Sequence, residues 1–479
     1  MLHSTYKHKK NWNEILIFIL EYRFQKWLLV LMTTITHYGC ESFVDLDPPK
    51  NLLASETVFE DVATVKSAMA NIYFNMRDNS LLSGSSGLSI HLSTYSDELD
   101  YYLTNENYLQ FYHHTITATN SYSSAWWSDT YNLIYAANDV IEGLANSTVL
   151  NSNDRNHYMA QALFVRAYLH SLLLQLYGPI PYINTTDYIV NNTVSRDTEE
   201  EVYQFIISDL NQAIQLFDDN QVHEERVVPS KIVAKALLAR IYLFTQQWAL
   251  AETMASEVIS AGEYLLEPDI TTVFLKESRE TLWQFKPNGV SHENTYEANQ
   301  FIIQMIPGQT FSFSDSFLES FESGDLRRTH WVGTFTSDEG VTLFYPFKYK
   351  ETFNSTDASL EYSVVFRLAE QYLIRAEART HLGTIAGAQS DLNMIRNRAG
   401  LSNTTVMTES DLLTTIWHER KMELFTELGQ RWFDLKRTNR GAEVLSQMKP
   451  SWNDTDYLFP IPTAELELNP NLQPQNDGY

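Results

Sequence analysis

Acidic residues are the first candidates for chemistry in this chain, because it holds 60 Asp and Glu residues among its 479. Asp97, Glu98 and Asp100 lie close together, and glycoside hydrolysis needs two carboxylates at a set separation across the bond that is cut. With so many acids, such clusters arise by chance. The sequence has no Walker loop and no Gly-x-Gly-x-x-Gly, Gly-x-Ser-x-Gly or His-Glu-x-x-His motif. We therefore predict no catalytic residues and no cofactor.

A second group of ionisable residues lies near the C-terminus. Arg420 and Glu423 are three residues apart, and Arg431, Asp434 and Arg437 repeat that spacing. Residues three apart share one face of a helix, so these charges are expected to form a ladder of ion pairs. We interpret them as partly buried pairs that fix helix packing, and not as acids or bases.

The sequence does not predict a metal site. His113 and His114 are adjacent, so their rings would not share a helix face. The single cysteine, Cys40, excludes both intrachain disulfides and a Cys-based metal site.

Aromatic residues in polar, aperiodic segments are the candidates for binding. Sugars present apolar C–H faces ringed by hydroxyls, so their sites use aromatic platforms flanked by amide and carboxylate groups. The chain holds 27 Tyr and 10 Trp. We predict that the ligand is bound by Tyr101, Tyr102, Tyr296, Asn294 and Trp331. The tryptophans inside helical patterns are expected in the core: Trp126, Trp127, Trp417 and Trp432.

Helices must position these residues, because helical periodicity dominates the chain. Apolar residues recur at helical spacing over 162–176, over 234–244 with a following segment at 248–259, and from Val365 to Ala376 with a partner at 386–398. A helix, a short turn and a second helix are typical of tetratricopeptide-like pairs. The sequence therefore predicts a mostly α fold built from helix pairs.

Two segments lack this periodicity. Residues 80–124 are rich in Ser, Tyr, Asn and His, and residues 267–360 alternate aromatic and polar side chains. The second segment includes strand-like runs at 281–285 and 342–345. Long irregular segments within a compact domain are usually functional loops. We therefore expect a helical scaffold that presents an irregular, loop-rich ligand-binding region.

The N-terminal segment predicts export. Arg23 and Lys26 precede a short apolar stretch, 27–32, and Cys40 follows a small residue, Gly39. A basic start, an apolar segment and a small residue before the cut form a secretory signal, and an acylated Cys would then anchor the mature chain. We predict a signal peptide over residues 1–39 and a lipid-anchored tether over residues 40–60, although position 37 is His, where such signals usually carry Leu.

Several motifs, taken in order, resemble the SusD/RagB family of outer-membrane nutrient-binding lipoproteins. The C-terminal motifs are Glu419–Leu424, Gly429–Arg437, Phe459–Pro462 and Asn469–Pro470. Upstream matches are Trp127 with Tyr131 and Asn138, Arg166–Tyr168 leading to Leu176–Pro181, Asp325–Arg328, and Arg367–Glu370 with Ala376–Ala378. One departure is Glu427–Gly429, where many members have Phe-Glu-Gly.

The resemblance implies a single SusD-like domain over residues 61–479. Its expected parts are helical hairpins at 61–79, 125–265 and 361–440, the loop-rich ligand region at 80–124 and 267–360, and a C-terminal tail at 441–479.

The resemblance also implies a function. The resemblance leads us to expect a lipid-anchored protein, exposed at the surface of the outer membrane, that captures an oligosaccharide or polysaccharide. It would deliver this ligand to a SusC-like TonB-dependent transporter, without catalysis or a cofactor. Peptide capture is the alternative within the family, and an all-α glycoside hydrolase or a tetratricopeptide adaptor is an alternative outside it. A formal net charge of -26 argues against nucleic acid as a partner.

Overall fold

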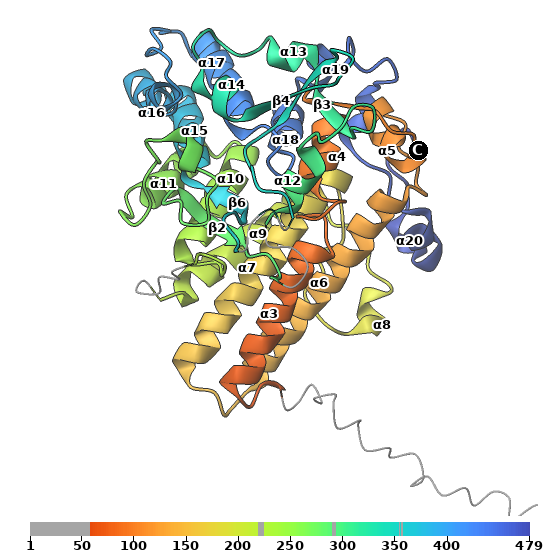
Figure 1. Cartoon of the computed structure of the whole chain (residues 1–479). Coiled ribbons are helices and arrows are strands. Elements are labelled where there is room, and N and C mark those ends of the chain that lie inside the picture. The colour runs from red at the N-terminus through yellow and green to blue at the C-terminus, as the bar shows by residue number, and fades with distance from the viewer. Residues whose placement is uncertain (1–57, 219–224, 290–293, 354, 356–357) are drawn as a thin grey trace, which may run out of the picture. The chain divides into compact units, whose positions relative to one another are not determined.

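The computed structural model describes residues 58–479, apart from residues 219–224, 290–293, 354 and 356–357 (Figure 1). The predicted signal peptide and the Cys40 anchor lie outside the described residues. All described residues belong to one compact unit. Within this described part, no helix is both long enough and apolar enough to cross a bilayer.

Helices make up most of the described chain, which confirms the predicted mostly α fold. The long helices are α3 (Val62–Asp78), α6 (Ser121–Asn146), α7 (Ser152–Tyr177), α9 (Glu199–Leu216), α10 (Lys231–Phe244), α11 (Trp248–Ile259), α15 (Leu368–His381), α16 (Ile385–Arg398) and α17 (Glu409–Leu424). The short helices are α4 (Leu88–Tyr95), α5 (Glu106–His113), α8 (Tyr188–Asn191), α12 (Tyr296–Phe301), α13 (Asp315–Leu318), α14 (Leu326–His330), α18 (Gln430–Arg437), α19 (Gly441–Leu445) and α20 (Thr463–Leu468).

The long helices pack side by side in an order that largely follows the chain (Figure 1). α7 contacts α6 and α9, α10 contacts α9 and α11, and α15 contacts α11, α16 and α17. The predicted pairs at 234–259 and 365–398 correspond to α10 with α11 and to α15 with α16. Alanines at the contacts, such as Ala239, Ala251 and Ala376, are fully buried and let the helix axes approach closely.

α7 is the most deeply buried of these helices. Asn151 begins it by accepting a hydrogen bond from the backbone N–H of Asp154 at 3.0 Å, and residues 160–177 are buried on every side. The helix ends at Gly178, whose φ is +72°. A Cβ at this position would lie 2.8 Å from Leu458 Cδ1, so the backbone needs glycine both for its conformation and for space.

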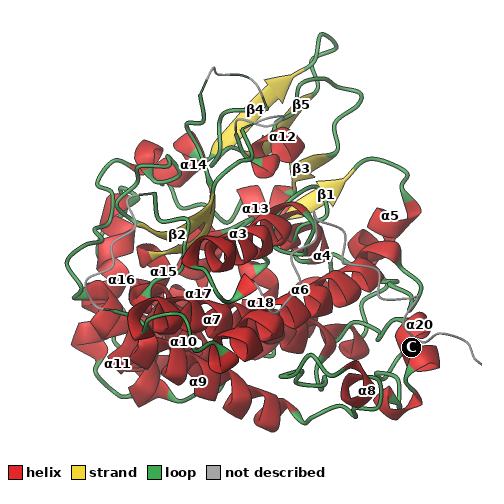
Figure 2. Ribbon diagram, turned by 90° about the horizontal axis from the view of Figure 1, so that it is seen from below, coloured by secondary structure: helices red, strands yellow, loops and turns green. Residues whose placement is uncertain are grey.

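Short strands form three antiparallel pairs (Figure 2). They are β1 (Leu99–Tyr101) with β3 (Phe311–Phe313), β2 (Thr281–Phe285) with β6 (Ser363–Arg367), and β4 (Val332–Thr336) with β5 (Thr342–Pro346). The predicted strands at 281–285 and 342–345 are confirmed as β2 and β5. The β1–β3 pair joins the two aperiodic segments, with Leu99 opposite Phe313 and Tyr101 opposite Phe311.

Two local expectations need correction. Val365 lies in β6, and α15 begins only at Leu368, because residues 363–367 pair with β2 before the chain turns into the helix. The segment 80–124 also contains α4 and α5. Every residue of α4 is buried, including His91 and Ser93, so a polar sequence concealed a helix that is enclosed on all sides.

Candidate functional site

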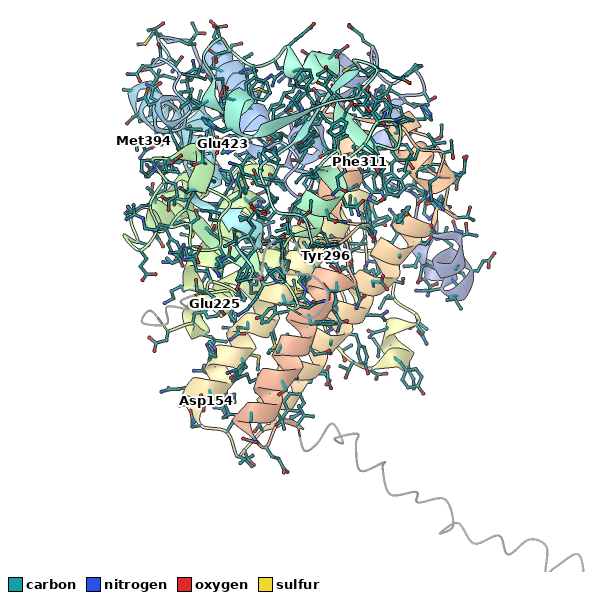
Figure 3. The ribbon with its side chains drawn as sticks, in the orientation of Figure 1. Asp154, Glu225, Tyr296, Phe311, Met394 and Glu423 are labelled. Carbon is teal, nitrogen blue, oxygen red and sulfur yellow. The ribbon has the colours of Figure 1, made fainter. Side chains whose placement is uncertain are left out.

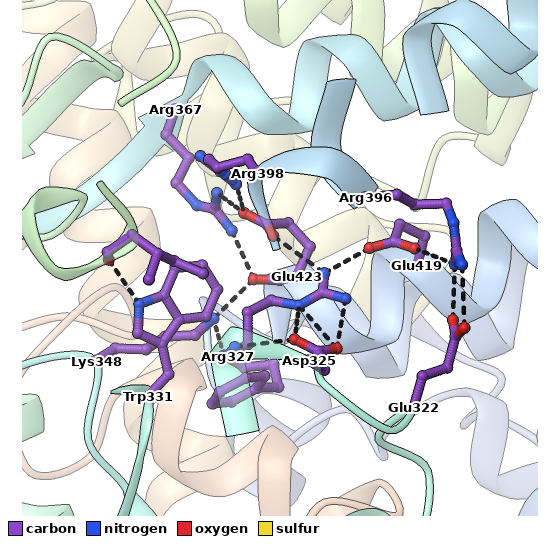
Figure 4. Close-up of polar contacts among 12 residues, drawn as sticks. Glu322, Asp325, Arg327, Trp331, Lys348, Arg367, Arg396, Arg398, Glu419 and Glu423 are labelled. Atoms are coloured by element: carbon purple, nitrogen blue, oxygen red, sulfur yellow. Dashed lines mark hydrogen bonds and ion pairs between the residues drawn. The ribbon is translucent and has the colours of Figure 1, made fainter. Parts of the chain in front are cut away.

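A buried layer of ion pairs lies among α14, β6, α16 and α17 (Figure 4). Its centre is Glu423 of α17, which is fully buried. Glu423 Oε2 lies 3.2 Å from Arg327 Nη1, and Oε1 lies 2.5 Å from Arg367 Nη1. Arg398 contacts the same Oε1. These arginines come from α14, β6 and α16, so one carboxylate joins four elements that are distant in sequence.

The electrostatics of this layer indicate a structural role. Burial alone would raise the pKa of Glu423, but the guanidinium groups of Arg398, Arg367 and Arg327 hold that pKa well below its usual range. Burial raises the pKa of neighbouring Glu419, whose Oε1 lies 2.6 Å from Arg327 Nη1. Since both carboxylates are fully buried and bound by arginines, neither can act on a ligand in solvent.

The C-terminal charges are buried as predicted, but most of their partners differ from the predicted ladder. Arg420 Nε binds Asp434 Oδ2 at 2.7 Å, and therefore does not pair with Glu423. Arg437 does pair with Asp434 at the predicted spacing, with an Nε–Oδ1 distance of 2.7 Å. Arg431 binds Asp97, which lies far from it in the sequence. Because α17 and α18 are in contact, Arg420 pairs with a carboxylate of the neighbouring helix and not with one on its own helix.

The acids at 97–100 do not form a catalytic pair. Arg431 binds Asp97 through two hydrogen bonds of 2.6 and 2.9 Å. Glu98 is 1% exposed, and burial raises its pKa to about 7. Asp100 Oδ1 accepts a hydrogen bond from Tyr112 at 2.8 Å. Because Asp97 and Glu98 are enclosed, they cannot flank a glycosidic bond in this structure. Among the residues that the structure describes, no group of three or more His, Cys, Asp or Glu could hold a metal ion.

The prediction of Trp331 as a ligand platform is wrong for this structure, because its side chain lies in the core. Trp331 is 1% exposed, and its indole N–H donates to the carbonyl oxygen of Ile270 at 3.0 Å. Phe274 and Phe425 pack edge-on against its ring, with centroids 5.4 and 6.1 Å away. The polar residues that precede it form the short helix α14, whereas the ring of Trp331 is buried in the core.

Asn294 is also enclosed, and it holds a loop in place. It is 1% exposed, and its side-chain carbonyl accepts hydrogen bonds from the backbone N–H groups of Leu360 and Glu361 at 3.1 and 3.4 Å. These bonds connect the start of α12 to the segment before β6. Asn294 therefore positions its neighbour Tyr296 and does not offer its own amide to a ligand.

Tyr101 is the last residue of β1 and Tyr102 follows it, and the two side chains differ in exposure. Tyr101 is 8% exposed and stacks on Tyr108 of α5 with centroids 5.2 Å apart. Tyr102 is 43% exposed, and its hydroxyl lies 2.9 Å from Ser312 Oγ on β3. Tyr102 can therefore present a ring to a ligand, and Tyr101 supports the neighbouring ring of Tyr108.

Tyr296 is half-buried at the start of α12. Its ring meets Phe353 edge-on with centroids 5.1 Å apart, and it lines a small hollow together with Arg77. Arg77 and Phe285 also line a neighbouring groove of about 750 Å³ that runs along α3. This groove includes Phe74, which is 44% exposed. Tyr296 thus lies beside an open surface that a ligand can reach.

The loop at residues 80–87 links Tyr296 to the tyrosines of α5. Ser83 Oγ lies 3.4 Å from Oε1 of Glu297, the residue after Tyr296. Tyr108 donates its hydroxyl hydrogen to the carbonyl oxygen of Ser85 at 2.7 Å. The same short loop therefore contacts both α12 and α5, and it brings the two predicted binding segments together.

We define the loop face as the exposed parts of residues 80–87, 102–105 and 302–310 together with Tyr296. Figure 3 labels Tyr296 and also Phe311, the buried first residue of β3, which directly follows the segment 302–310. The backbone N–H of Tyr102 donates to the carbonyl oxygen of Thr310 at 3.1 Å, so this bond joins the segments 102–105 and 302–310.

Sequence reasoning missed three exposed apolar side chains near this face: Phe74, Leu103 and Met305, which are 44%, 43% and 61% exposed. Phe74 belongs to the amphipathic pattern of α3, so nothing in the sequence distinguishes it from a core residue. Leu103 and Met305 lie in the aperiodic segments, but a search restricted to aromatic rings passes over them.

The chain matches two family models. Residues 42–243 match the model described as "Starch-binding associating with outer membrane", and residues 324–479 match the model described as "SusD family". Among curated proteins, it is 28% identical to SusD-like protein P2 of Formosa agariphila, over 94% of this chain and 98% of that protein.

Solved structures share the fold. A SusD superfamily protein from Bacteroides vulgatus has a TM-score of 0.77 and 18% identity, with 88% of this chain and 100% of the other covered. Surface glycan-binding protein A from Bacteroides thetaiotaomicron, in complex with laminarihexaose, has a TM-score of 0.74 and 19% identity, with 86% and 99% covered. The order of the motifs, the buried charges that they form and these matches agree: the chain belongs to the SusD/RagB family.

Proposed function

We propose that this protein captures an oligosaccharide or polysaccharide on the loop face and delivers it to a SusC-like TonB-dependent transporter of the outer membrane. In this proposal, a lipid on Cys40 anchors the chain at the cell surface, and the partly acidic tether at 40–60 separates the domain from the membrane. The description of the matched N-terminal model, with its starch binding and its association with the outer membrane, supports this assignment.

The observation that carries the proposal is the β1–β3 pair. It brings Tyr102, from one aperiodic segment, beside Ser312 and Thr310, from the other. The loop at 80–87 then connects this pair to Tyr296. Rings on a rigid helical scaffold with hydroxyl and amide groups between them have the composition that sugar rings require.

The family relationship points to the same ligand class. The neighbour from Bacteroides thetaiotaomicron is a glycan-binding protein that holds laminarihexaose. At 19% identity this likeness shows the fold alone, so we do not infer that this chain binds the same glycan. No chemistry on the ligand is proposed, because Asp97 and Glu98, two of the three clustered acids that could have formed a catalytic pair, are buried.

Native gels cast with polysaccharides test the proposal. We would compare the purified chain in gels that contain laminarin, starch, arabinoxylan, galactomannan, alginate or polygalacturonate. We expect one or more of these to retard the protein. Tyr102→Ala and Tyr296→Ala should each reduce the retardation, since each removes a ring from the loop face. Phe205→Ala is the matched control, because Phe205 is similarly exposed (42%) on the distant helix α9.

The outcomes separate the alternatives. Retardation that both tyrosine substitutions weaken and Phe205→Ala leaves unchanged supports glycan capture at the loop face. Binding to peptides, with no retardation by any polysaccharide, would assign the protein to peptide capture. Release of reducing ends from a polysaccharide would overturn the proposal that the protein is not an enzyme. Co-purification with the transporter, compared between wild type and a Cys40→Ala variant, tests the delivery step.

A further inference from the structure

A second groove lies among α6, α8 and α20, which appear together in both views of the ribbon (Figures 1 and 2). Its volume is about 320 Å³. None of its lining residues belongs to the loop face. Two tyrosines form its open rim: Tyr135 on α6 is 48% exposed, and Tyr188 on α8 is 68% exposed.

The groove combines these rings with polar groups. Asn132 and Asn192 line it, and within the part of the chain that the structure describes their side-chain amides make no hydrogen bond. Glu465 of α20, which is half-buried, and Trp127 of α6 also line the groove. Partial burial raises the pKa of this carboxyl group. The groove therefore offers aromatic faces, amide donors and acceptors, and one carboxylate.

Hydrogen bonds fix the walls of the groove before any ligand arrives. Glu142 of α6 accepts from both the backbone N–H and the hydroxyl of Thr186, at 2.9 and 2.5 Å, which joins α6 to the start of the α8 segment. Asn469 donates to the carbonyl oxygen of Val194 at 2.8 Å, which joins the end of that segment to the C-terminal tail. A preformed site loses less entropy on binding.

We propose that this groove is a second carbohydrate subsite, which holds one or two neutral sugar rings of a chain already engaged at the loop face or of a second chain. The proposal rests on the proposed glycan-binding function. A volume of about 320 Å³ lies at the small end of the range for ligand pockets, roughly 300–1,000 Å³. It suits a short stretch of a polysaccharide, and not a whole folded partner.

The charges of the groove select against acidic sugars. Among the described residues that line it, none is Lys or Arg, and Glu465 contributes the only carboxylate. A uronate or sulfate placed here would meet the like charge of Glu465, and none of the described lining residues is a lysine or arginine that could balance it. Neutral glycans are therefore expected to use this groove, whereas alginate and polygalacturonate are not.

Two neighbouring residues of α8 provide the test variant and its control. Tyr188 lines the groove, but the neighbouring Ile189, which is 65% exposed, does not. We would titrate the purified chain and its Tyr188→Ala and Ile189→Ala variants against whichever neutral polysaccharide of the gel panel retards the wild type. Loss of one stacking ring should weaken binding about fivefold to tenfold. Ile189→Ala should bind like the wild type, and unchanged circular dichroism would exclude misfolding.

The binding of the variants shows whether the groove is a second subsite. Weaker binding in Tyr188→Ala alone, with further loss when it is combined with Tyr102→Ala, supports two subsites. Unchanged glycan binding in Tyr188→Ala, while Tyr102→Ala binds weakly, overturns the second subsite and leaves the loop face intact. An equal loss in Tyr188→Ala and Ile189→Ala would also overturn it, because it would indicate that the exposed apolar surface of α8 acts as a whole. If no polysaccharide retards the wild type, both proposals fail.

Discussion

Arg431 and Asp97 are 334 residues apart in the chain, yet they form a two-pronged ion pair with N–O distances of 2.6 and 2.9 Å. Lys421 Nζ lies 3.0 Å from the same carboxylate. The pair joins α18 to the segment just before β1. A motif near the C-terminus thus fixes the start of the strand that presents Tyr102.

Removing one member of this pair should strongly destabilise the domain. Asp97→Asn leaves the Arg431 guanidinium buried without its counter-charge, a change that typically costs about 3–5 kcal/mol. Chemical denaturation with urea measures the effect. Glu443→Gln is the control, because the Arg440–Glu443 pair is largely exposed and should contribute less than about 1 kcal/mol. Similar losses in both variants would contradict a structural role for the buried pair.

Substitution of Trp331 should affect stability and leave glycan binding unchanged. Trp331→Phe keeps an aromatic ring in the core but removes the N–H that donates to Ile270, so we expect a loss of about 1–3 kcal/mol. In the gel assay, the folded variant should be retarded as much as the wild type, whereas Tyr102→Ala should be retarded less. Impaired retardation in a fully folded Trp331→Phe would restore Trp331 as a candidate platform.

The helical scaffold could be predicted from the sequence because apolar residues at helical spacing indicate which residues face the core. α7, α10 and α16 follow the predicted pattern, and their ends coincide with clear signals such as Gly178 and Gly400. α4 escaped prediction because it is only eight residues long and because its polar residues, such as His91 and Ser93, are as deeply buried as its apolar ones. Eight residues are too few to establish a helical period, whereas the longer apolar repeat of α7 does establish one, although residues 160–177 of α7 are also enclosed.

The candidate site was only partly predictable, since exposure is a tertiary property. Tyr102 and Trp331 both lie in polar, aperiodic surroundings, but one is 43% exposed and the other 1%. What distinguishes them is the packing of distant residues, such as Phe425, onto one ring and not the other. The same reason explains the wrong partner predicted for Glu423, whose arginines come from three other elements.

Gly429 offers a test of the motif that precedes α18. Its φ is +74°, and a Cβ would lie 2.2 Å from Leu92 Cδ1 of the enclosed helix α4. Gly383 has the same φ, but a Cβ added there would meet no atom within 4 Å. Gly383→Ala should therefore cost only the backbone strain, about 1–2 kcal/mol, and Gly429→Ala about 1–3 kcal/mol more. Equal thermal stability of the two variants would show that Leu92 moves away at little cost.

His170 should make the folded state sensitive to acid. Its Nδ1–H donates to the carbonyl oxygen of Arg166 at 2.9 Å, and its Nε2 accepts from the backbone N–H of Ile183 at 3.1 Å, so the buried ring is satisfied only when neutral. Burial lowers its pKa from 6.5 to about 3. Between these values the unfolded chain binds a proton that the folded chain does not, so stability falls as the pH falls.

A difference measurement isolates this contribution, because other buried groups titrate in the same range with the opposite sign. Glu98, with its pKa raised to about 7, favours the folded state as the pH falls from 7 towards 4.5. Both the wild type and His170→Gln contain Glu98, so it cancels when their unfolding free energies are subtracted. The advantage of the wild type should shrink by about 1.4 kcal/mol per pH unit between pH 5.5 and 4. Parallel curves over that range would mean that His170 accepts a proton without unfolding the domain.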